Sequence, residues 1–124
     1  MTPMTVGQSL GKALRLRAEG RLPEAEAAFH EAAREDPADA RPVIGLAALY
    51  NSLGQPGPAN VLFSRAVTMD PESAPAWDGL GESLVGIGRD EEAVNAWRLA
   101  IVLDPDRGKT HFSLGAALAS FGDH

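Results

Sequence analysis

The chain has 124 residues, of which 44% are apolar and 23% are charged, values typical of a folded globular domain. Its 17 acidic and 11 basic residues give a net charge of −6, which argues against nonspecific binding to nucleic acid or to an anionic membrane. Cysteine is absent, which excludes disulfides, thiolate metal sites and a thiol nucleophile.

The N-terminal stretch MTPMTVGQSLGKALRLRAEG lacks the continuous apolar core of a signal peptide. No later stretch reaches the roughly 18 apolar residues that a membrane span needs. We therefore expect a cytoplasmic protein without a membrane span.

Residues 6–39 form the first of three similar units. Gly20 separates two amphipathic helical patterns, and Asp36-Pro37 closes the second one, because proline disfavours a helical conformation in the residue before it. Residues 40–73 and 74–107 follow the same plan at a spacing of 34 residues, and residues 108–122 carry one further helical pattern. The positions that recur at this spacing include Gly20, Gly54 and Gly88 at the turns, Asp36-Pro37, Asp70-Pro71 and Asp104-Pro105 at the ends, and Phe29, Phe63 and Trp97 within the second helices.

The starts of the second helices also carry recognisable signals. Asp90-Glu91-Glu92 predicts a helix that begins with an N-cap at Asp90 and acidic residues in its first turn. Pro23 and Pro58 fall in the equivalent first turns of the two preceding units, where proline costs no hydrogen bond. Each unit is thus expected to be a helical hairpin.

These residues resemble the tetratricopeptide repeat family. The third unit carries the family's signature at Trp77, Leu80, Gly81, Leu84, Gly88, Ala93, Trp97, Ala100 and Pro105, and the second at Leu46, Ala47, Tyr50, Gly54, Ala59, Phe63, Ala66 and Pro71. The first unit departs from it at Ser9 and Lys12, as a repeat with one solvated flank would tolerate. The resemblance implies an all-α fold, an α-α superhelix of about seven helices, with residues 1–124 as one domain and the first helices lining a concave groove.

Catalytic and metal-binding patterns are absent from the sequence. His30, His111 and His124 have no partners at metal-ligand spacing, and no serine lies in a nucleophile elbow. His111 falls at a repeat position that we expect to pack between helices. Two phosphate-binding patterns fail. A dinucleotide-binding fingerprint that starts at Gly79-Leu80-Gly81 needs a glycine where Leu84 stands, and a P-loop that runs from Gly81 to Gly86 needs a lysine where Ile87 stands. We expect no enzymatic activity, no cofactor and no metal.

The groove face follows from a rotation of about 100° per helical residue combined with the family geometry. The expected partner-binding residues are Arg17, Arg41, Ile44, Ala48, Asn51, Asp78, Gly79, Glu82, Gly86, Lys109 and Phe112.

Two features of this face have more than one interpretation. Asp78 and Glu82 are either a solvated acidic face, a contact for a cationic partner or, least favoured, a glycosidase-like pair. Gly11, Gly45, Gly79 and Ser113 recur at 34 residues and either allow neighbouring first helices to approach closely or leave a roomy groove.

The leading functional hypothesis is a non-catalytic scaffold or adaptor that binds a protein or peptide segment in the groove. Some family members hold a C-terminal carboxylate with lysine and asparagine, but the corresponding positions here are Leu10, Leu14, Ile44, Ala48, Asp78 and Glu82. An amphipathic helix with apolar anchors and a basic end is therefore the expected partner. The alternatives are self-association into a homo-oligomer, and the N-terminal repeat region of a larger enzyme whose catalytic domain lies outside this chain.

Overall fold

The computed structural model describes residues 5–122, which form seven α-helices and no strand. The helices are α1 (Val6–Ala18), α2 (Leu22–Glu35), α3 (Ala40–Ser52), α4 (Pro56–Met69), α5 (Ala74–Gly86), α6 (Asp90–Leu103) and α7 (Gly108–Gly122). The predicted all-α fold is confirmed. The division into repeats at residues 6–39, 40–73 and 74–107 remains our interpretation of this helix order.

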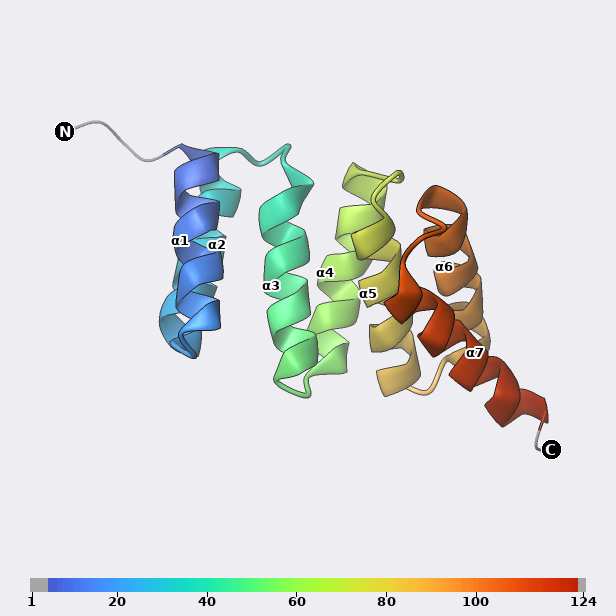
Figure 1. Cartoon of the computed structure of the whole chain (residues 1–124). Coiled ribbons are helices and arrows are strands. Elements are labelled where there is room, and N and C mark those ends of the chain that lie inside the picture. Colours follow the sequence, from blue (N-terminus) through green and yellow to red (C-terminus); the bar gives the residue numbers. More distant parts are fainter. Residues whose placement is uncertain (1–4, 123–124) are drawn as a thin grey trace.

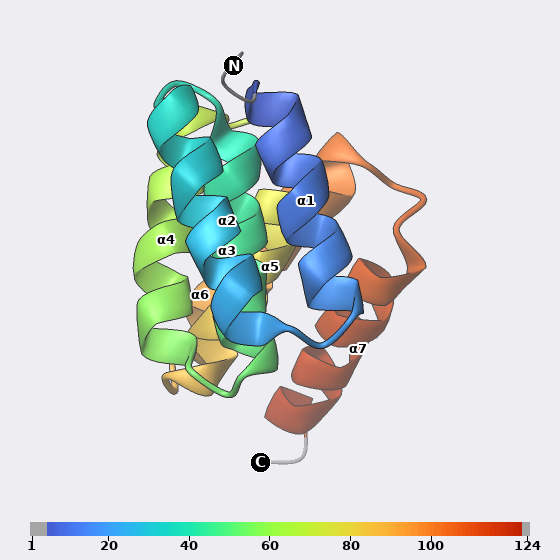
Figure 2. The ribbon, with the colours of Figure 1, turned by 90° about the vertical axis from the view of Figure 1, so that its left-hand side faces the viewer.

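Successive helices pair as antiparallel hairpins that stack side by side along the molecule (Figure 1). Seen from one end, the odd-numbered helices lie in one layer and the even-numbered helices in the other (Figure 2). Contacts between helices of the same layer join α1 to α3 and α3 to α5. The odd-numbered layer is therefore the inner, more tightly packed side of a curved stack.

The turns within the hairpins depend on glycine. Gly20, Gly54 and Gly88 have φ angles of 77°, 72° and 83°, a region that residues with a Cβ rarely adopt. In each case the N–H of the following residue bonds back to the end of the first helix, as Arg89 does to Leu84 O at 2.8 Å. The predicted role of these glycines is confirmed.

The second helices end at the three Asp-Pro pairs, as predicted. Asp36, Asp70 and Asp104 are the C-cap residues, with φ near −140° in place of the helical value. The carboxylate of each accepts a hydrogen bond from the backbone N–H two residues later, at 3.1–3.3 Å. The same local turn therefore begins α3, α5 and α7 at matching positions.

Two details differ from the predictions. The N-cap of α6 is Arg89, and Asp90 is the first helical residue, so the predicted N-cap at Asp90 is wrong by one position. Ser9 does not lie on a solvated flank: it is fully buried, and its hydroxyl donates to Glu35 Oε1 at 2.7 Å. This hydrogen bond allows a polar side chain where other repeats place an apolar one.

His111 is exposed, whereas the repeat pattern predicts a position packed between helices. Its Nε2 lies 2.7 Å from Pro105 O, while the equivalent Trp77 indole N–H donates to Pro71 O at 2.8 Å. The imidazole thus makes a contact like that of the tryptophan with the loop before its own helix. This is a structural role.

Candidate binding groove

The inner layer of helices carries two adjoining cavities. One, of about 390 Å³, lies between α1 and α3, and the other, of about 330 Å³, lies between α3 and α5. Ile44, Ala48 and Pro75 line both cavities, which are therefore continuous, and we call them together the groove. Every predicted partner-binding residue lines the groove except Gly86 and Phe112.

The end of the groove between α1 and α3 is apolar, with an arginine at each side. Leu10, Leu14 and Ile44 supply aliphatic surface that is partly exposed. The Arg17 guanidinium lies 5.9 Å from the centre of the Phe29 ring, within the range of a cation–π contact. Arg41 forms two hydrogen bonds from Nε and one from Nη2 to the carboxylate of Asp39, which keeps the pKa of Asp39 below its usual value.

The other end of the groove holds two ion pairs that join α5 to the start of α7. Arg107 Nη2 lies 3.0 Å from Asp78 Oδ2, and Lys109 Nζ lies 2.7 Å from Glu82 Oε1. The hydrogen bond to Glu82 raises the pKa of Lys109 above its usual value. Both carboxylates that the sequence offers to a cationic partner therefore already have a cation from their own chain.

Asp78 is far less accessible than its predicted position on the groove face implies. Only 2% of the residue is exposed, and Oδ1 has no hydrogen-bond partner among the described residues. Arg107, which covers it, was not among the predicted site residues. The signal for it was weak: a single cation just after the Asp104-Pro105 turn, with no pattern to pair it with Asp78.

The groove glycines receive aromatic rings from the preceding second helices. A Cβ on Gly45 would lie within 3.0 Å of ring atoms of Phe29, and one on Gly79 would lie within 3.0 Å of three ring atoms of Phe63. The close approach predicted for these glycines is present, but the neighbour is an even-numbered helix and not another first helix. The predicted extra room at Gly45 and Gly79 is wrong, because the rings fill it.

Two further glycines of α5 also face side chains of neighbouring helices. A Cβ on Gly81 would collide with the Trp97 indole, so this signature glycine allows α5 and α6 to pack closely. Gly86 faces Pro56 at the start of α4, so it allows two helix ends to meet and does not line the groove.

Phe112 lines a third cavity, of about 350 Å³, between α7 and the ends of α5 and α6. The Phe112 side chain is largely in contact with solvent, since 79% of the residue is exposed. Val85, Asp90, Trp97, Ser113, Ala116, Ala117 and Ser120 complete the lining. We call this the α5–α7 cavity; its lining shares no residue with that of the groove.

Residues 5–122 contain no group of three or more histidine, aspartate or glutamate side chains that could hold a metal ion. None of the helices in this range is long and apolar enough to span a membrane. His124 lies outside the described residues.

Comparisons with known proteins extend this description. Residues 16–59 match the model of a family described as tetratricopeptide repeat, and no curated protein matches the sequence. Among solved structures, the chain is similar to the first tetratricopeptide repeat domain of Spaghetti (RPAP3) bound to an HSP90 peptide. The TM-score is 0.90 and the identity 17%, over 95% of this chain and 94% of that one.

Two other solved structures show the same fold in proteins of different kinds. The chain is similar to the type III secretion translocator chaperone SycD of Yersinia enterocolitica, with a TM-score of 0.85 and 21% identity over 96% of each chain. It is also similar to an O-GlcNAc transferase of Thermobaculum terrenum, with a TM-score of 0.87 and 29% identity. That match covers 95% of this chain but only 23% of the transferase.

Proposed function

We propose that this chain, whose residues 16–59 match the tetratricopeptide repeat model and whose fold is that of tetratricopeptide repeat domains, is a non-catalytic scaffold that holds a segment of a partner protein in the groove. The observation that carries this proposal is the continuity of the two cavities along the inner layer, across α1, α3 and α5. A continuous concave surface of this kind suits an extended or helical segment better than a small molecule.

The character of the groove defines the segment that it would accept. Its α1–α3 end offers aliphatic surface from Leu10, Leu14 and Ile44, which an apolar side chain would cover. Its α3–α5 end offers the Lys109–Glu82 pair, whose atoms are partly exposed and can exchange hydrogen bonds with a polar backbone. Asn51 Nδ2 is already bonded to Gly79 O at 3.2 Å and holds this wall in place.

The first tetratricopeptide repeat domain of RPAP3, which has the same fold as this chain, is bound to an HSP90 peptide. We propose a different sequence preference for this chain, because aliphatic and acidic side chains stand where some family members place lysine and asparagine. A C-terminal carboxylate would find no free cation at Asp78, because Arg107 is already paired with that side chain. Apolar anchoring is therefore the main source of affinity in this proposal.

The test places a charge in the middle of the groove. Ala48 lines both cavities, so Ala48→Glu adds bulk and a carboxylate to the shared part of the groove without removing any existing contact. Val61→Glu on α4 is the matched control, because Val61 is 68% exposed and lies on the outer layer. Both variants should keep the helical circular dichroism spectrum of the unmodified chain.

The measurement is binding of partners captured from a cell extract and then purified, by isothermal titration calorimetry. We expect Ala48→Glu to weaken binding at least about tenfold, the effect of losing about 1.4 kcal/mol, while Val61→Glu leaves it unchanged. Equal affinity of all three proteins would show that the groove does not bind the partner. Light scattering on the free chain separates this function from self-association.

A second candidate function is the repeat region of a larger enzyme. The likeness to part of an O-GlcNAc transferase favours it, at 29% identity over 95% of this chain. The full reading frame would decide this point, since a catalytic domain encoded downstream would support it and an isolated repeat domain would oppose it. We also propose a cytoplasmic location, which fractionation of cells that express the tagged chain would test.

A further inference from the structure

The α5–α7 cavity lies apart from the groove, at the end of the stack, and is lined mainly by apolar side chains. Val85 comes from α5, Trp97 from α6, and Phe112, Ala116 and Ala117 from α7. In Figure 1, α7 runs at a slant across the stack, and its C-terminal end diverges from α5. The cavity has a volume of about 350 Å³, whereas on the same measure one water molecule needs roughly 10–15 Å³.

The packing of a ring from an even-numbered helix against the next inner helix changes at α7. Phe29 and Phe63 fill the space next to Gly45 and Gly79, but the equivalent pair in the next unit is Trp97 and Ser113. The Trp97 ring packs against Gly81 on its own hairpin partner, and its N–H donates to Asp78 O at 3.1 Å. The indole is therefore held on α5, and α7 carries a larger residue where a glycine would allow close contact.

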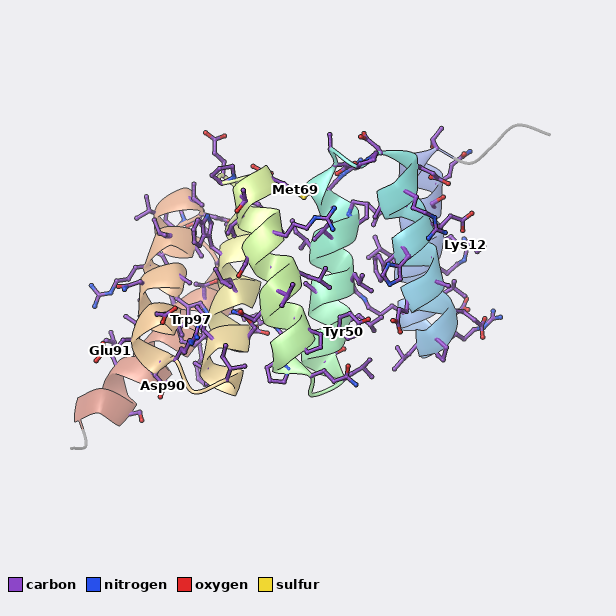
Figure 3. All side chains as sticks on the ribbon, turned by 180° about the vertical axis from the view of Figure 1, so that it is seen from behind. Lys12, Tyr50, Met69, Asp90, Glu91 and Trp97 are labelled. Carbon is purple, nitrogen blue, oxygen red and sulfur yellow. The ribbon has the colours of Figure 1, made fainter. Side chains whose placement is uncertain are left out.

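Charge gathers at one end of this cavity. Asp90 lines it directly, and Glu91 and Glu92 follow in the first turn of α6; all three residues are exposed. Figure 3 shows Asp90 and Glu91 close together at this end of α6. None of the ion pairs in the described part of the chain involves these carboxylates, although Arg89 adjoins them. The helix dipole stabilises acidic groups at this position but leaves their net negative charge available to a partner.

The carboxylates of the groove are paired with cations of the same chain, and those at the start of α6 are not paired with any described residue. This difference decides where a basic group of a partner would bind. Asp78 and Glu82 are neutralised by Arg107 and Lys109, so a cation arriving there would have to displace one already in place. A cation that binds at the start of α6, beside Asp90, Glu91 and Glu92, has no ion pair between described residues to displace. Charge complementarity therefore moves the basic end of the expected partner from the groove to the start of α6.

We propose that the α5–α7 cavity binds a bulky apolar side chain of a partner protein, and that Asp90, Glu91 and Glu92 select a lysine or arginine close to it in the same segment. This inference rests on the proposed function and specifies the chemistry of the partner. Burial of the apolar side chain against Val85, Trp97 and Ala116 supplies affinity. The three carboxylates supply selectivity for charge.

Three capped synthetic peptides serve as probes. The first carries a tryptophan followed after one glycine by three lysines, the second replaces the lysines by glutamates, and the third replaces the tryptophan by alanine. Each is titrated into the uniformly ¹⁵N-labelled full chain, and amide and indole N–H chemical shifts are recorded. We expect the first peptide alone to move the signals of Val85, Asp90, Ala116 and the Trp97 indole at low millimolar concentration or below.

Two triple variants test the charge requirement. Asp90→Asn combined with Glu91→Gln and Glu92→Gln should weaken binding of the first peptide about tenfold, the sum expected for three partly exposed ion pairs. The matched control neutralises three glutamates that line a cavity at the opposite end of the stack, Glu19→Gln, Glu24→Gln and Glu31→Gln, and should leave the affinity unchanged. Each variant removes three negative charges, so the two have the same net charge.

Several results would overturn the proposal. The proposal is wrong if none of the peptides binds, or if the lysine and glutamate peptides bind equally well. It is also wrong if the chemical-shift changes are confined to α1 and α3. Equal weakening by the two triple variants would reduce the effect to net charge alone. Because the calorimetric test with Ala48→Glu concerns the groove and not this cavity, a failure here with a positive result there leaves the proposed function standing.

Discussion

Substitution of Gly79 by alanine tests the idea that the glycines of the inner layer exist to receive aromatic rings. The new Cβ would lie less than 3.0 Å from three ring atoms of Phe63, a separation that real Cβ atoms essentially never show. The ring cannot swing into solvent, because Phe63 is 1% exposed and packs among Ala47, Ala59 and Leu80. The variant must therefore move a helix or strain the ring.

Two opposing effects set the magnitude. Overpacking of a closed core costs about 1–3 kcal/mol, and a clash with three ring atoms places this case near the upper value. Replacement of glycine by alanine within a helix returns roughly 1 kcal/mol through helix propensity. We expect Gly79→Ala to lower the free energy of unfolding by about 2 kcal/mol.

Gly11 provides a control at the equivalent position of the first repeat. A Cβ there would meet no atom within 4 Å, so Gly11→Ala should gain helix propensity without a clash and raise stability by up to about 1 kcal/mol. Urea unfolding followed by circular dichroism measures both variants. Phe63→Leu in the Gly79→Ala background should recover part of the loss, because it removes the ring atoms that collide.

Equal stability of Gly79→Ala and Gly11→Ala would refute this reasoning. It would mean that α4 and α5 adjust at no cost, and that the recurrence of glycine at this position has another cause. A loss that Phe63→Leu does not reduce would have the same consequence.

Three further substitutions test other features. Arg107→Ala should lower the free energy of unfolding by about 2 kcal/mol in a urea titration, since it leaves the buried Asp78 carboxylate without a partner, and Asp78→Asn should recover part of that loss. Gly54→Ala should cost about 1 kcal/mol in the same assay, because φ is 72° at this turn. Asp39→Asn should reduce the loss of stability on acidification: the lowered pKa of Asp39 gives stability that is present above its usual value of 3.8 and lost as the pH falls through the lower folded value. Asparagine is an equally good N-cap for α3, so thermal unfolding at neutral pH should show only the loss of the Arg41 ion pair.

The fold was predictable because its determinants are local and repeated. A glycine at a turn and an Asp-Pro pair at a helix end act within a few residues, so Gly54 or Asp70 can be interpreted without knowledge of the rest of the chain. The spacing of 34 residues then reveals that the same hairpin recurs. The one-residue error at Asp90 lies within the usual uncertainty of helix ends.

The candidate site was predictable only as a surface. Helical rotation placed Ile44, Ala48 and Glu82 on the groove, because their directions depend on one helix alone. The burial of Asp78 and its pairing with Arg107 depend on how α7 meets α5, which is set by packing across 29 residues of sequence. The glycine at position 79 was ambiguous for the same reason, since its neighbour Phe63 is on another helix.

Both tryptophans of this chain lie on a single hairpin, Trp77 on α5 and Trp97 on α6. Their intrinsic fluorescence therefore reports on the C-terminal part of the stack, whereas circular dichroism reports on every helix. In a molecule whose units contact only their neighbours, the two ends can unwind at different denaturant concentrations. If α1 and α2 unfold first, ellipticity will fall before the emission changes, and the order of the two transitions will identify the weaker end without any added label.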